Sequence, residues 1–176
     1  MSERLTPHFS DVEFVDWRQG HVWQTPTSRA RYLELCQRTL EPLREALGRS
    51  VRIVSGERKE SKTAANSRHM PPELRPSVKE RGKPDGSPDA AADVQVGGML
   101  PIDVALVALR LMGQREIPVG GVGIYPSFVH IDNRGRLASW KGSGVDDATW
   151  QRFRAAVVDC ATAVRISMEV GSDDNA

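Results

Sequence analysis

The sequence has few cysteines, no long apolar run and no marked excess of either charge. Its two cysteines, Cys36 and Cys160, form no CxxC pair, so no short thiolate motif is present for metal or redox chemistry. Both occupy apolar positions of predicted helices, and we expect two buried thiols, with a disulfide as the alternative. No apolar stretch approaches the ~20 residues of a membrane span, which predicts a chain without one.

The charges are nearly balanced, with 24 basic and 23 acidic residues and a formal net charge of +1. Nucleic-acid binders usually carry a basic excess, so we predict no nucleic-acid partner. Basic residues gather loosely between Arg52 and Lys83, but acidic residues interrupt them throughout. Such mixing is typical of a solvated loop surface.

The spacing of apolar residues predicts an α+β domain. A helix is expected over Ser28–Leu47, with a kink or break near Leu40 because Pro42 cannot continue the regular hydrogen bonding. Further elements are predicted as strands at 51–54 and 94–96, a helix at 101–112, two short strands between 120 and 131, and a helix at 146–166. Together they predict one domain over residues 1–170, a small antiparallel sheet flanked by helices, and a disordered tail at 171–176.

Three polar residues are candidates for a functional site, although each is a weak signal when taken alone. His69 falls in a long polar segment, and Asp93 directly precedes a predicted strand, where an inward-facing acid needs a partner. His130 lies in a predicted strand whose alternation places it on the face of Phe128, opposite Val129 and Ile131. Two histidines and a carboxylate are a ligand set of catalytic zinc sites, but no HExxH motif is present and spacing alone does not select this trio.

The remaining histidines, His8 and His21, have contexts typical of structural or surface residues.

An ordered set of segments resembles the M15 zinc peptidases, which include D-Ala-D-Ala carboxypeptidases and dipeptidases and phage L-alanyl-D-glutamate endolysins. The segments are Leu5-Thr-Pro-His-Phe9, Leu40-Glu-Pro-Leu-Arg44, Val54-Ser-Gly-Glu-Arg58, Asn66-Ser-Arg-His69, Ala91-Ala-Asp93, Gly121-Val-Gly-Ile-Tyr125 and Phe128-Val-His-Ile-Asp-Asn-Arg134. They span most of residues 5–140, and the ordered set is far more specific than any one segment.

The resemblance implies a hedgehog/D-Ala-D-Ala-peptidase-like fold and a Zn²⁺ ion bound by His69, Asp93 and His130. It also implies that Arg58 contacts the substrate, for which a guanidinium suits because it grips a carboxylate or carbonyl through two donors. Ser67 would be a second substrate contact, and Trp140 a wall of the cleft. The substrate would be a stem peptide of peptidoglycan.

The sequence departs from the family pattern around Asp93. His69 and Asp93 lie much farther apart than in the family, so a polar insertion at about residues 70–88 is expected to loop out, as a lid or a binding element. Asp89 replaces a glycine that the family places shortly before the aspartate. Asp85 and Asp89 are therefore alternatives to Asp93 as the ligand, and we favour Asp93 because a predicted strand follows it directly.

The general base departs as well. Several family members carry a glutamate at the position of Ser127, which cannot accept a proton in this way. The branch of the family that the chain most resembles has a His-x-Asp segment instead, which implies Asp132 as the base, and alternation places Asp132 on the strand face of His130. The alternative is that Asp132 orients a ligand or pairs with Arg134.

The expected activity is hydrolysis of a stem peptide by zinc-activated water, at a D-Ala-D-Ala or an L-Ala-D-Glu bond. One alternative is a non-catalytic wall-binding or virion-associated module of the same fold; another is a scaffold with structural histidines and no stoichiometric metal. The segment Met1–Pro7 lacks the apolar core of a signal peptide, which predicts synthesis in the cytoplasm and action on the wall after release or as a virion component. We expect a monomer, from either a phage or a bacterium.

Overall fold

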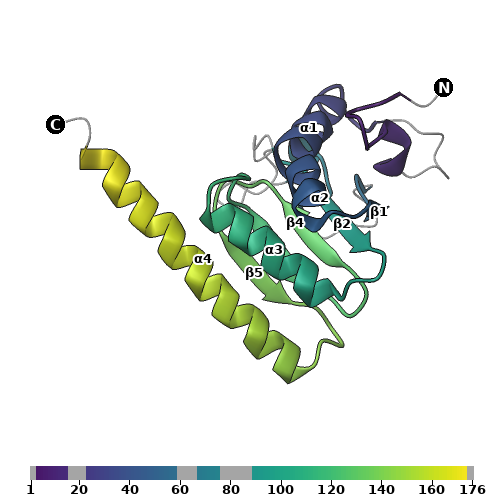
Figure 1. The fold of residues 1–176 in the computed structure, drawn as a ribbon. Helices are drawn as coiled ribbons and strands as arrows, with labels where there is room; N and C mark the ends of the chain where they lie inside the picture. The colour runs from purple at the N-terminus through teal and green to yellow at the C-terminus, as the bar shows by residue number, and fades with distance from the viewer. Residues whose placement is uncertain (1–2, 16–22, 59–66, 76–88, 174–176) are drawn as a thin grey trace.

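The fold is a mixed α+β domain in which helices flank a five-stranded sheet (Figure 1). The computed structural model describes residues 3–15, 23–58, 67–75 and 89–173. The helical elements are η1 (Asp11–Glu13), α1 (Ser28–Leu35), the π-helical turn η3 (Cys36–Leu40), α2 (Glu41–Leu47), η5 (Pro72–Leu74), α3 (Pro101–Gly113) and α4 (Asp147–Asp173). The strands are β1 (Val51–Ser55), β2 (Ala91–Val96), β3 (Gly121–Ile124), β4 (Val129–Asp132) and β5 (Ala138–Lys141).

The predicted helix over 28–47 is present but interrupted, as the proline suggested. A π-helical turn, Cys36–Leu40, separates α1 from α2, and Pro42 lies in the first turn of α2. A proline lacks the N–H for the regular bond and crowds the carbonyl one turn earlier, so a wider turn just before it relieves both problems.

The strands are arranged in the order β1-β2-β4-β3-β5. The pairs β1–β2, β2–β4 and β3–β4 are antiparallel, which confirms the expected mostly antiparallel sheet. The sequence did not reveal β5, which pairs in parallel with β3. Its four residues, Ala138–Lys141, are half exposed and carry no run of alternating apolar residues, so hydrophobic periodicity gives no signal there.

One face of the sheet builds the hydrophobic core, and α3 covers it with α4 running alongside α3 (Figure 1). Val94, Val129 and Ile131 point into this core, together with Leu109 of α3 and the fully buried Phe153 of α4. Residues between them in the strands therefore point to the opposite face. Because of this alternation, Asp93 and His130 lie on the face opposite the core, where they form a polar site.

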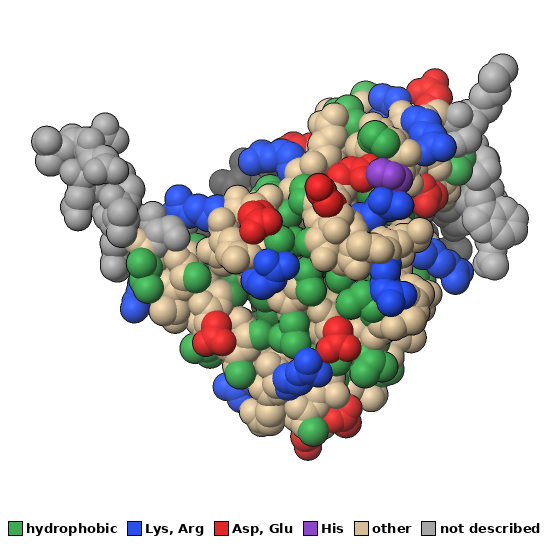
Figure 2. Space-filling view, in the orientation of Figure 1, with side chains coloured by type: hydrophobic (Ala, Val, Ile, Leu, Met, Phe, Trp, Pro, Cys, Tyr) green, Lys and Arg blue, Asp and Glu red, His purple; other side chains and the backbone are tan. Residues whose placement is uncertain are grey.

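Both cysteines are free and buried, as expected for small apolar side chains. His8 lies at the surface and pairs with Glu41 at 2.7 Å, whereas His21 lies outside the described residues. Of the predicted tail, residues 171–173 belong to the end of α4, and residues 174–176 lie outside the described residues. Within the described ranges, no helix is both long and apolar enough to span a membrane. On the face shown in Figure 2, acidic and basic side chains are interspersed.

The insertion at 70–88 does not loop out at its start. Met70, Pro71 and Pro72 are buried, and the Arg75 side chain has no solvent exposure. Arg75 donates to the Asp89 carboxylate at 2.6 Å, so an ion pair joins the two ends of the segment inside the protein. This pairing explains why residues 70–75 pack inward; residues 76–88 lie outside the described ranges.

Candidate metal centre

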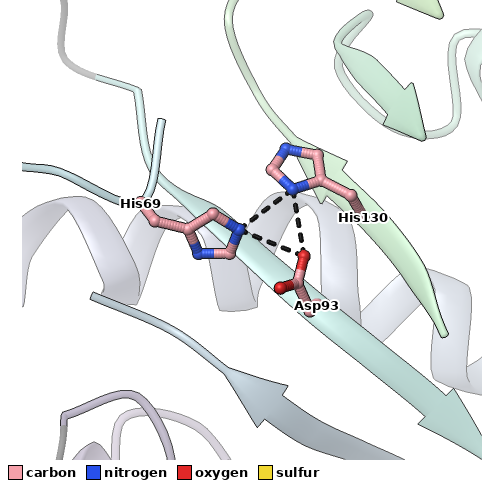
Figure 3. A group of neighbouring side chains, drawn as sticks. All are labelled: His69, Asp93 and His130. Carbon is pink, nitrogen blue, oxygen red and sulfur yellow. Dashed lines mark hydrogen bonds and ion pairs between the residues drawn. The ribbon is translucent and has the colours of Figure 1, made fainter. Parts of the chain in front are cut away.

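A register row across the sheet creates the candidate site. Asp93 on β2 lies opposite His130 on β4, and His130 lies opposite Gly123 on β3. The row continues outward to Ser55 on β1 and Trp140 on β5. His69 joins this row from the loop before η5. The structure thus brings together the three ligands that the sequence proposed (Figure 3).

Three ligand atoms meet at nearly equal distances. Nε2 of His69 lies 3.0 Å from Nδ1 of His130 and 3.1 Å from Oδ1 of Asp93, and the last two atoms are 3.0 Å apart. Zinc bonds of 2.0–2.1 Å in a tetrahedral arrangement separate neighbouring ligand atoms by about 3.3 Å. The spacing is therefore close to that of three corners of a metal tetrahedron.

In each imidazole, the nitrogen that points away from the cluster donates a hydrogen bond. Nδ1 of His69 lies 2.6 Å from the Gly56 carbonyl oxygen, which can only accept, so this nitrogen donates. Nε2 of His130 lies 3.1 Å from the Asp132 carboxylate and donates in the same way. In the neutral rings the inner nitrogens then carry lone pairs that face each other and the Asp93 oxygen.

Three converging acceptors require a positive charge between them, either a proton or a metal ion. Because all three side chains are buried, water does not screen their repulsion. The described residues of this cluster can therefore hold a metal ion, and the donor chemistry of two imidazoles and one carboxylate fits a divalent transition metal.

The charges around the cluster shift its pKa values in different directions. Burial lowers the pKa of His69 and outweighs the attraction of Asp93. In His130 burial acts in the same direction, but the hydrogen bonds to Asp132 and Asp93 outweigh it and raise the pKa. Burial alone would raise the pKa of Asp93, yet hydrogen bonds from His130 and His69 hold it well below the usual range. Of the two imidazoles, His130 is therefore the one that protonates more readily.

Asp132 lies behind His130 and away from the converging ligand atoms. Its side chain is fully buried; Gly121 N donates to it at 2.8 Å, and the Arg134 guanidinium donates to both of its oxygens. Burial would raise its pKa, but the bonds from His130 and Arg134 hold the pKa well below the usual range. This geometry favours the alternative in which Asp132 orients His130 over the role of a proton acceptor beside the metal.

The cluster opens into a pocket of about 440 Å³. The predicted substrate residues Arg58, Ser67 and Trp140 all line it, as do four residues to which the sequence assigned no role there: Arg68, Tyr125, Phe128 and Arg134. Alternation placed Phe128 on the strand face of His130, and Tyr125 and Arg134 fall inside the segments that resemble the M15 peptidases. The sequence therefore marked these three residues but did not predict that they line the pocket. Arg68 adjoins His69 in sequence, but nothing in the pattern distinguished it.

Arg58 lies between the His-Asp-His cluster and the pocket. Its NH2 group pairs with Oδ2 of Asp93, and its Nε donates to Ser55 Oγ at 2.8 Å. The side chain is 38% exposed, so the guanidinium holds Asp93 in place and also faces the pocket.

Asp89, an alternative ligand, lies outside the cluster. Its carboxylate is buried between Arg75, at 2.6 Å, and Arg68, at 3.1 Å, while its backbone oxygen accepts from Arg31 at 3.0 Å. Asp89 therefore pairs with two arginines and is not a member of the His-Asp-His cluster. Asp85 lies outside the described residues.

The structure defines an α+β domain with a buried His-Asp-His cluster that can hold a metal ion at the base of an open pocket. No family model, curated protein or solved structure matches this chain. The resemblance to the M15 peptidases thus stays a prediction from the sequence segments.

Proposed function

We propose that the protein is a zinc-dependent peptidase that hydrolyses stem peptides of peptidoglycan, at a D-Ala-D-Ala or an L-Ala-D-Glu bond, with a hedgehog/D-Ala-D-Ala-peptidase-like fold. The observation that carries the proposal is the convergence of three acceptor atoms, from His69, Asp93 and His130, at the base of a pocket. The ordered sequence segments support the peptidase class and its substrate, neither of which the geometry specifies.

In the proposed reaction, some residues of the chain orient the metal-binding histidines and others bind the peptide. Gly56 and Asp132 fix the imidazole tautomers so that lone pairs face the metal position. His69, Asp93 and His130 would hold the zinc ion, which would supply Lewis acidity to activate water near neutral pH and to polarise a substrate carbonyl. Arg58 and Ser67 face the same pocket and hold the peptide, and Trp140 forms its wall.

One observation favours a second candidate, a wall-binding module without turnover. Among the described residues that line the pocket, Asp93 is the single carboxylate, and it is a proposed ligand. A peptidase usually needs a proton acceptor near the attacking water. A binding module needs the pocket but not this acceptor.

Metal content and wall digestion together test the proposal. We expect about one zinc per chain by elemental analysis, release of new amino groups from purified sacculi, and loss of that release with a strong chelator. His130→Ala should lose the metal, whereas His8→Ala, which changes a surface histidine, should keep it. Zinc without released amino groups would support the binding module, and iron in place of zinc would redirect the chemistry because this donor set also binds Fe(II). A metal-free protein that does not bind sacculi would refute both candidates.

A further inference from the structure

The wall of the pocket beside His130 depends on Gly123, a residue that has no side chain. Gly123 lies in register between His130 and Trp140, and a Cβ added to it would come within 2.3 Å of Trp140 Cε2. The indole therefore lies directly over the glycine. It reaches the imidazole of His130, with ring centroids 4.8 Å apart.

This placement directs the indole nitrogen to Tyr125. Nε1 of Trp140 lies 3.0 Å from the Tyr125 hydroxyl oxygen. An indole N–H is a donor only, so the tyrosine oxygen accepts in this bond and its single proton points elsewhere. Within the described part of the chain, no hydrogen bond takes up that proton, and Tyr125 lines the pocket.

The Tyr125 ring is held firmly. It stacks on Phe128, with centroids 4.3 Å apart and planes 14° from parallel. On another side, a Cβ added to Gly142 would come within 2.2 Å of the ring. A fixed ring loses little conformational freedom when its hydroxyl binds a ligand, which favours affinity.

We infer that Tyr125 is a substrate-positioning residue whose hydroxyl donates a hydrogen bond to a carbonyl or carboxylate oxygen of the bound peptide. The inference rests on the proposed function for the identity of the ligand. It assigns Trp140 a second task besides forming the wall: its N–H occupies the acceptor side of the hydroxyl, so that the donor side serves the ligand.

Nuclear magnetic resonance on the full chain with ¹⁵N-labelled indoles tests the arrangement first. Trp140→Phe identifies the Trp140 signal by its disappearance. In Tyr125→Phe the Trp140 indole proton should shift to lower frequency, because it loses its acceptor, while the other indole signals stay in place. An unmoved Trp140 signal would overturn the inference.

Binding of the dipeptides D-Ala-D-Ala and L-Ala-D-Glu to the zinc-free protein tests the role. We expect Tyr125→Phe to raise the Kd of at least one dipeptide about three- to tenfold, the effect of one hydrogen bond. Ser127→Ala, which removes a hydroxyl from the same turn but outside this pocket, should leave the Kd unchanged. Equal affinities of wild type and Tyr125→Phe, or no binding of either dipeptide to the wild type, would overturn the inference. Dipeptide binding without wall hydrolysis would refute the peptidase and leave Tyr125 as a binding residue. Wall hydrolysis that Tyr125→Phe leaves unaffected would support the peptidase and refute the role of Tyr125.

Discussion

Replacing Asp132 by asparagine separates the two roles considered for this residue. Both carboxylate oxygens accept hydrogen bonds from N–H groups: Oδ1 from Gly121 and Arg134, and Oδ2 from Arg134 and His130. Asparagine has the same shape, but its NH2 group must face one of these donors. If it faces His130, the imidazole proton moves to Nδ1, where the metal requires a lone pair.

The expected loss can be estimated from this geometry. Removing the partner that orients a metal-binding histidine typically weakens metal affinity about 10- to 100-fold, or about 1.4–2.7 kcal/mol. We therefore expect the zinc Kd of Asp132→Asn to rise by this factor, measured by competition with a chromogenic chelator. Asp147→Asn, which removes an exposed partner of Lys141, should leave the zinc Kd unchanged.

A general base gives a different result. If Asp132 only accepted a proton from water, the variant would lose wall hydrolysis and keep wild-type zinc affinity. That outcome, with an unchanged thermal midpoint in zinc-free buffer, would refute the positioning role.

Three further predictions concern acidity and packing. The partners of His130 raise its pKa above the usual ~6.5, so protonation of this proposed ligand should compete with zinc already near neutral pH. Below the raised pKa, zinc affinity should fall by up to about tenfold per pH unit, measured by chelator competition from pH 8.5 to 6. A zinc affinity that does not change with pH would contradict this prediction. The lowered pKa values of Asp93 and Asp132 contribute stability that is present above about pH 4 and is lost on further acidification, so the zinc-free midpoint should drop there, and its persistence to pH 2 would count against the ion pairs. Asp89→Ala removes a carboxylate that pairs with buried Arg75 and should cost about 3–5 kcal/mol in urea unfolding, as should Phe153→Ala in the core. An Asp89→Ala loss below about 1 kcal/mol would show that this ion pair is not needed to hold residues 70–75 in place.

The sequence alone determined the elements whose signal is local. Alternation in Phe128–Asp132 placed Val129 and Ile131 in the core and His130 on the other face, and proline chemistry placed the break in the first long helix. The resemblance of the ordered segments, and not their spacing, singled out His69, Asp93 and His130 as one set. The strand and helix inferences depend on periods of two and 3.6 residues, which are properties of the chain itself.

Only the tertiary structure decided how these residues act on one another. Sequence cannot show that Asp132 faces the outer nitrogen of His130, because the two-residue alternation gives a shared face but not the side-chain direction within it. Nor can it show that Asp89 pairs with Arg75 across the insertion, or that Gly123 lets Trp140 reach over the sheet to Tyr125. The parallel strand β5 was missed for the same reason: its pairing with β3 is a long-range contact without a local pattern.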